Sequence, residues 1–156
     1  MMKVYSPKVP KLSVKHLWFL FFILLCVTLG HRVAYAGTPT FSSSFSPSTI
    51  APNSTSTLTY IINNTANNTP VSNVAFTNTL PANVTLASPV NISDSCLGSV
   101  TAAAGTSNTS YTLDRLPLGV SGEISVDVTS STAGSHVNTS GSLISSEGNS
   151  GTSNAT

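Results

Sequence analysis

The sequence has 156 residues, only 7% of them charged, and a formal net charge of +1. Five of its six cations lie within residues 1–36, so the 120 residues that follow carry Arg115 alone against five acidic side chains. Because contacts to phosphate groups require Lys or Arg, this composition excludes a nucleic-acid-binding protein. The uneven charge also divides the chain into two segments of different character.

Residues 1–36 have the layout of a secretory signal peptide. A basic stretch precedes an apolar run over residues 17–29, and a short polar segment leads to the small residues Ala34 and Ala36. Signal peptidase requires small side chains at these two places, which predicts cleavage before Gly37. The alternative is an uncleaved membrane anchor, but a spanning helix needs about 20 apolar residues and this run is shorter. We therefore expect a secreted or cell-surface protein without a transmembrane span after cleavage.

The segment after residue 36 has the pattern of short β-strands. Apolar and polar residues alternate in several stretches rich in Thr and Val, which is typical of half-buried strands. Clusters of Asn, Gly and Pro separate these stretches and favour turns. In chain order, the side chains expected to face inward are Leu58, Tyr60 and Ile62, then Val74 and Phe76, Val84 and Leu86, Tyr111 and Leu113, and finally Ile124, Val126 and Val128.

A bias toward Ser, Thr and Asn is also compatible with disorder. Disordered segments usually combine high net charge with few branched or aromatic residues, whereas here charge is low and apolar residues alternate. The pattern therefore predicts an all-β fold, an antiparallel β-sandwich over residues 37–144. Residues 145–156 are expected to form a polar C-terminal tail or a truncated last strand.

Few side chains after residue 36 are suited to catalysis or metal binding. His136 is the lone histidine there, and no nucleophile motif accompanies it. Cys96 and His136 alone do not make a zinc site, and Asn91–Asp94 is only a weak fragment of a calcium-binding loop. The sequence thus predicts no catalytic residues, no metal and no cofactor, so we do not expect an enzyme.

Cys96 is the one cysteine after residue 36, because Cys26 belongs to the predicted signal peptide. We expect a free thiol without an intramolecular disulfide. A lone cysteine in an exported chain can pair with another chain or remain a free thiol. The interpretation that we favour is a small, buried hydrophobic side chain.

Four segments, in the same order along the chain, resemble a family of bacterial extracellular domains. The family is the conserved repeat domain of bacterial surface proteins, the domain of unknown function eleven and its close relatives. The resemblance implies an immunoglobulin-like sandwich, usually present in tandem copies, with no enzyme activity and no established ligand. The four segments are Gly37–Pro52, Ser56–Asn64, Phe76–Val84 and Ile124–Ser130.

The chain departs from this family pattern at two places. Family members commonly have a second cysteine where this chain has Gly122, so the resemblance implies that the usual disulfide partner of Cys96 is missing. The family pattern also continues with an apolar strand after Ala155. Because unpaired sheet edges template further pairing, we expect self-association through an open edge.

These observations predict a non-catalytic structural, spacer or adhesion-type module of a bacterial envelope or secreted protein. The alternative is a carbohydrate- or protein-binding domain that uses the loop of residues 63–70, since binding sites on a rigid sandwich usually lie in its loops. The expected partners are other envelope proteins, host-surface proteins or glycans.

Overall fold

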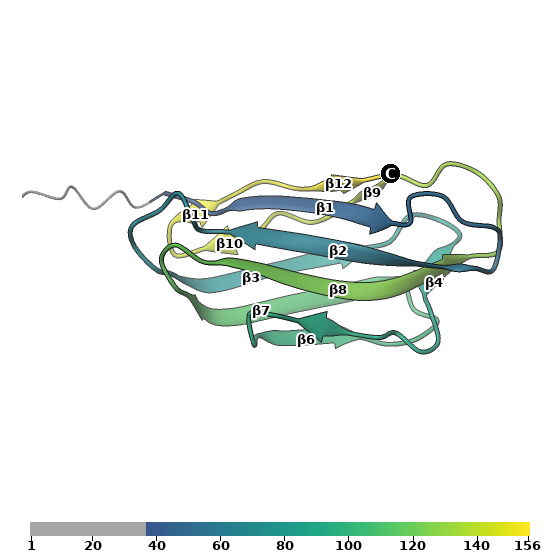
Figure 1. Ribbon diagram of the computed structural model, residues 1–156, viewed down its shortest axis with the longest axis horizontal. Coiled ribbons are helices and arrows are strands. Elements are labelled where there is room, and N and C mark those ends of the chain that lie inside the picture. The colour runs from purple at the N-terminus through teal and green to yellow at the C-terminus, as the bar shows by residue number, and fades with distance from the viewer. Residues whose placement is uncertain (1–36) are drawn as a thin grey trace, which may run out of the picture. The chain divides into compact units, whose positions relative to one another are not determined.

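The computed structural model describes residues 37–156, which form two facing antiparallel β-sheets (Figure 1). In the first sheet the strand order is β1-β2-β8-β4, and β5 also pairs with β8. The long strands β1 and β2 pair over seven residues, from Thr40 opposite Asn63 to Ser46 opposite Thr57. The strands of this sheet are β1 (Thr40–Ser46), β2 (Thr55–Asn63), β4 (Val84–Leu86), β5 (Ser93–Asp94) and β8 (Ser121–Ser130).

The second sheet has the order β11-β10-β3-β7-β6, and a two-stranded piece, β12-β9, continues its edge. The continuation is a hairpin, because the Leu143 N–H donates to the Gly151 carbonyl and the Ser140 N–H to the Ser153 carbonyl, both at 2.9 Å. The strands are β3 (Val71–Thr79), β6 (Ser99–Ala102), β7 (Asn108–Leu116), β9 (Asn138–Thr139), β10 (Ile144–Ser145), β11 (Gly148–Asn149) and β12 (Asn154–Ala155).

The core lies between the sheets and consists of the side chains that the alternating pattern predicts. Each of the predicted inward-facing residues has at most 9% of its surface exposed. Burying one such aliphatic side chain stabilises the fold by about 1.5–3 kcal/mol. Four aromatic rings cross the interlayer space with centroids 4.8–6.1 Å apart, namely those of Phe41, Tyr60, Phe76 and Tyr111.

The C-terminal residues, for which the sequence suggests a polar tail or a truncated last strand, contain short paired strands. Residues 145–156 complete the hairpin, and Ser153 and Ala155 are buried there. The burial of Ser153 and Ser140 is compensated by a hydrogen bond, since the Ser153 N–H donates to Ser140 Oγ at 2.8 Å. The domain therefore extends through residue 156, beyond the predicted boundary at residue 144.

β12 lies beside β1, at the edge that we expected to be open (Figure 1). β12 pairs with β9 through Asn154 opposite Thr139 and Ala155 opposite Asn138. Self-association through this edge stays a prediction.

Candidate binding groove and the predicted site residues

A groove of about 570 Å³ lies where the connection from β1 to β2 meets the segment that follows β8. Its apolar part is formed by Phe45, Pro47, Ile50, Val84 and Val128. Ser and Thr hydroxyls form most of the rest, and the lining includes no Asp, Glu, Lys or Arg. The groove therefore suits an uncharged ligand with an apolar part.

Two hydrogen bonds fix the segments that line the groove. Ser56 Oγ donates to the Pro47 carbonyl at 2.7 Å, which fixes the start of the first connection. The Asn53 N–H donates to the Ser130 carbonyl at 2.7 Å, which joins that connection to the end of β8. These contacts lie within the domain and need no ligand to form.

His136 lines the groove but is not placed as a general base. Its Nε2 lies 3.1 Å from the Thr132 carbonyl oxygen and 3.3 Å from Ser130 Oγ. A carbonyl oxygen only accepts hydrogen bonds, so Nε2 carries its hydrogen in the shorter contact. A base must instead turn an unprotonated nitrogen toward the nucleophile. This geometry disfavours a Ser130–His136 dyad.

The loop of residues 63–70 uses its amide side chains to hold its own shape. Asn64 is fully buried, and its Nδ2 donates to the carbonyls of Thr69 and Pro117, both at 3.0 Å. Asn67 is also buried, and its Nδ2 donates to Asn64 Oδ1 at 2.7 Å. These two side chains are therefore occupied by structural contacts and do not face a ligand.

The predicted cleavage site lies at the boundary of the described residues. Ala34 and Ala36 are outside them, and Gly37 is the first residue inside. The Gly37 carbonyl accepts a hydrogen bond from Asn67 Nδ2 at 2.8 Å, so the domain is anchored from its first described residue. Cleavage before Gly37 stays a prediction.

Cys96 lies half-buried against Gly122, the position where the related family has its second cysteine. A Cβ atom placed on Gly122 would be 1.5 Å from Cys96 Sγ, and Cys96 is a free cysteine. Burial raises the pKa of the Cys96 thiol, and this outweighs the opposing effect of the nearby Tyr111 hydroxyl. Since the thiolate is the form that attacks electrophiles and binds metals, this thiol is poorly reactive at neutral pH.

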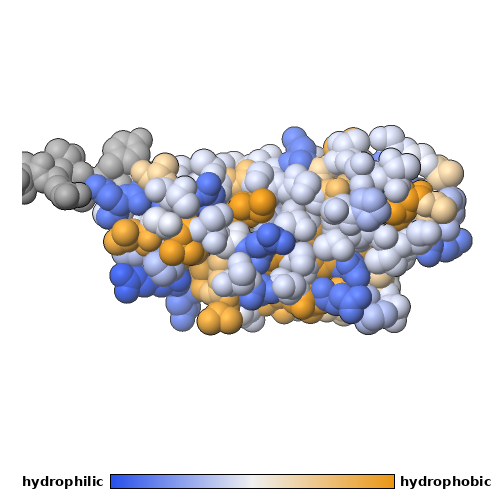
Figure 2. All heavy atoms as spheres, in the orientation of Figure 1, coloured by the Kyte–Doolittle hydropathy of each residue, from blue (hydrophilic) through white to orange (hydrophobic). Residues whose placement is uncertain are grey.

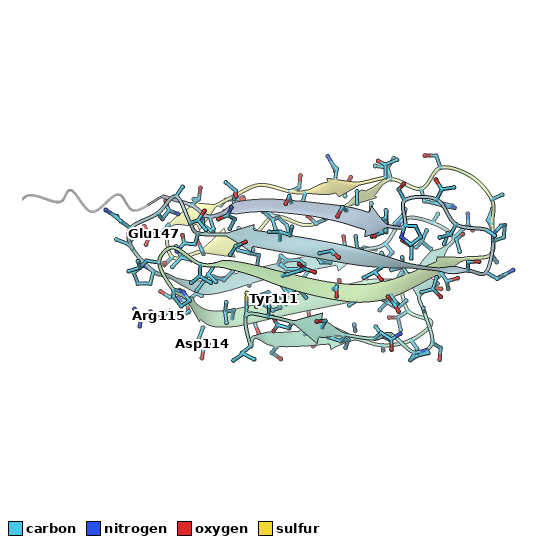
Figure 3. All side chains as sticks on the ribbon, viewed as in Figure 1. Tyr111, Asp114, Arg115 and Glu147 are labelled. Carbon is cyan, nitrogen blue, oxygen red and sulfur yellow. The ribbon has the colours of Figure 1, made fainter. Side chains whose placement is uncertain are left out.

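Charged groups are sparse on the surface of the domain. Asp114 and Arg115 project from the end of β7, and Glu147 from the turn between β10 and β11 (Figure 3). Within residues 37–156, no three His, Cys, Asp or Glu side chains lie close enough together to hold a metal ion. Across the same residues there is no helix with the length and apolarity needed to cross a membrane.

Comparison with known proteins places the domain in a family. The profile of the family described as Domain of unknown function (DUF7933) matches residues 39–156. The chain belongs to the DUF7933 family. The match includes β11 and β12, in agreement with the domain end seen in the structure. No curated protein matches the sequence significantly.

The DUF7933 domain shares its fold with a solved adhesin domain. The collagen-binding domain from a Staphylococcus aureus adhesin has a TM-score of 0.50 and 14% identity, covering 77% of this chain and 96% of that chain. The crystal structure of a collagen adhesin from S. aureus has a TM-score of 0.48 and 11% identity, covering 75% of this chain and 48% of that chain. The likeness concerns the fold, and it confirms the predicted antiparallel immunoglobulin-like sandwich.

Proposed function

We propose that this DUF7933 domain is a non-catalytic structural or adhesion-type module of an exported bacterial protein, and that it carries load along its strands. The observation that carries the proposal is the direction of the first and last strands. β1 and β12 lie beside each other and point the same way (Figure 1). A chain that enters at β1 and leaves after β12 therefore passes along the sandwich instead of returning to its starting end.

The pairing of β1 with β2 suits such a load. The ladder covers seven residue pairs, and antiparallel hydrogen bonds run perpendicular to the strands. A force along β1 consequently strains all of these bonds at once, whereas a force across the ladder would break them one after another.

The surface of the first sheet suits contact with uncharged polar partners. The register places the exposed Ser44 and Ser93 in one row with the half-buried Thr59 and the buried Ser125, across β1, β5, β2 and β8. On the face that Figure 2 shows, the apolar residues form separate patches, and weakly polar residues lie between them. Such a surface supports hydrogen bonding to envelope proteins, host-surface proteins or glycans, which we propose as the partners.

We also propose that the protein is extracellular and that it is related to the conserved repeat domain of bacterial surface proteins. These proposals rest on the signal-like pattern of residues 1–36 and on the resemblance to that domain. Retention of residues 1–36 on the exported product, seen by intact-mass measurement, would contradict cleavage before Gly37.

Single-molecule pulling tests the load-bearing role. With handles at residues 37 and 156, we expect one cooperative unfolding event that releases 120 residues, an extension of about 400 Å. The control attaches handles at Thr40 and Asn63, which face each other at one end of the β1–β2 ladder. This geometry opens the ladder pair by pair, so it should unfold at a clearly lower force. Equal forces in the two geometries would contradict the proposal.

A second candidate function is the binding of a ligand in the groove. The volume of the groove favours this function. About 570 Å³ falls within the range of roughly 300–1,000 Å³ that is usual for ligand sites. Ala133 lines the groove, so Ala133→Trp should fill it and abolish binding found on glycan or protein arrays. Ala104→Trp, at an exposed position outside the lining, is the matched control. Binding that survives Ala133→Trp would exclude the groove as the site.

A further inference from the structure

Four polar side chains meet inside the sandwich, each from a different strand. Tyr60 belongs to β2 of the first sheet, while Asn78 of β3, Thr109 of β7 and Asn138 of β9 come from the facing layer. Their exposed fractions are 1%, 1%, 5% and 0%. These four residues are called the polar cluster below.

The strand register and the interactions of the Tyr60 hydroxyl show that the members of the polar cluster lie close together. Asn78 and Thr109 are direct partners in the β3–β7 ladder, and both are buried. Burial raises the pKa of Tyr60, and hydrogen-bonding interactions with the side chains of Thr109 and Asn138, which lie near its hydroxyl, lower it by less. The Tyr60 ring packs on Phe76 at a centroid distance of 4.8 Å, which fixes the direction of the hydroxyl.

Six polar atoms of the cluster have no hydrogen-bond partner in the protein. They are the Tyr60 hydroxyl, Thr109 Oγ1, and both the oxygen and the nitrogen of the Asn78 and Asn138 amides. Nearly all buried polar groups in folded proteins are hydrogen-bonded, to protein or to ordered water. The cluster members lie close to one another, but none of the six atoms meets hydrogen-bond geometry with a protein partner, so a partner from outside the chain would satisfy them.

We propose that the polar cluster binds ordered water molecules that bridge the two sheets. The ligand must both donate and accept, because the amides and hydroxyls present both kinds of group. It must also be small and uncharged, since the sandwich interior is closed and no member of the cluster is charged. A buried water makes about three hydrogen bonds, so six atoms correspond to about two waters.

The bound water has a structural consequence for the edge of the second layer. Tyr60 is the cluster member from the first sheet, so its hydroxyl links that sheet to β9 through water. β9 itself pairs with β12 over only two residues. The water bridges therefore supply contacts that hold this short strand in place.

Oxygen-17 magnetic relaxation dispersion on the purified protein tests the proposal, because it counts long-lived internal waters. We expect at least two such waters in the wild type, about two of them in the polar cluster. Thr109→Val keeps the side-chain shape and removes the hydroxyl, so it should lose at least one of them. Thr112→Val, at an exposed position on the same strand, is the matched control and should lose none.

Two results would overturn the inference. One is a wild-type protein without long-lived internal water, or with water that Thr109→Val leaves unchanged. The other is a high-resolution crystal structure in which the four side chains bond directly to one another without solvent density between them. The wild-type crystal structure also shows whether solvent lies between the four side chains, so the inference can be tested even if Thr109→Val does not fold.

Discussion

Leu97 is held in a backbone conformation that disfavours leucine. Its φ is 60° and 90% of its surface is exposed. The carboxylate of Asp94 accepts hydrogen bonds from the N–H groups of Cys96, at 2.8 Å, and Gly98, at 2.6 Å, on either side of it. These two bonds fix the turn, so the side chain of Leu97 points outward without contributing to the core.

The strain at Leu97 predicts that Leu97→Asn raises the free energy of unfolding. The left-handed conformation costs an ordinary residue about 1–2 kcal/mol, and asparagine tolerates it better. We expect a gain of about 0.5–1 kcal/mol by urea unfolding. Leu118→Asn, at a position 56% exposed, should change stability little. A loss of stability in Leu97→Asn would show that the side chain is needed for packing.

The same turn depends on Asp94. Asp94→Ala removes the acceptor of two backbone N–H groups, so it should lower the free energy of unfolding by about 1–3 kcal/mol. Asp114→Ala, at an exposed position of β7, is the control and should cost far less. If the two variants unfold at the same urea concentration, the carboxylate of Asp94 does not hold the turn.

At the scale of elements, the contact between Cys96 and Gly122 joins the turn after β5 to β8. Because a Cβ on Gly122 would nearly coincide with Cys96 Sγ, Gly122→Cys should form a disulfide after a rotation of the Cys96 side chain. Closing a loop of this length stabilises a protein by about 3 kcal/mol. Thiol titration and melting with and without reductant measure the effect. Two titratable thiols in the folded, air-oxidised variant would contradict the prediction.

The variant Gly122→Ala tests the steric effect of a side chain at this position without the effect of a disulfide. The added methyl group meets Cys96 Sγ, so we expect a modest loss of stability in the single variant. Cys96→Ala removes the sulfur and should rescue Gly122→Ala in the double variant. A double-mutant cycle without coupling would show that the two positions do not touch in solution.

The strands were predictable to the extent that their side chains alternate in polarity. Strands β2 and β8 show that alternation clearly, and all their expected inward residues are buried. The hairpin of residues 138–155 lacks it, because Ser140, Ser145 and Ser153 are buried although they are polar. The groove and the polar cluster depend on which strands face each other, which no spacing along the chain reveals.

At the scale of the whole molecule, the two tyrosines after residue 36 are buried, and their burial lowers the free energy of unfolding at alkaline pH. Burial raises the pKa of Tyr60 and of Tyr111 well above the ordinary value, and nearby Cys96 and Asp94 raise that of Tyr111 further. Below a pH of about 10, both phenols are neutral in the folded and unfolded chains. Above it, only the unfolded chain releases these protons easily, so rising pH favours unfolding.

In the chain that begins at Gly37, these are the two tyrosines, so tyrosinate absorbance reports on them alone. We expect stability to start falling above a pH of about 8.5, because burial also raises the pKa of the Cys96 thiol in the folded chain. Above a pH of about 10 it should fall more steeply, by a further amount of about 1.4 kcal/mol per pH unit for each tyrosine. Tyrosinate absorbance and loss of the β-sheet circular dichroism signal should therefore appear together. Phenol ionisation at a pH of about 10 in a chain that keeps its β-sheet signal would show that the rings are accessible to solvent.

The placement of Arg115 in the ladder opposite Ser72 determines how the domain meets proteases that cut after basic residues. Residues 37–156 contain no other such cleavage point. The bond after it joins a strand residue to Leu116, which is 1% exposed, whereas a protease needs an unpaired, accessible stretch of chain. The folded domain should resist trypsin for as long as β7 stays paired with β3, and digestion would then measure how often that pair opens.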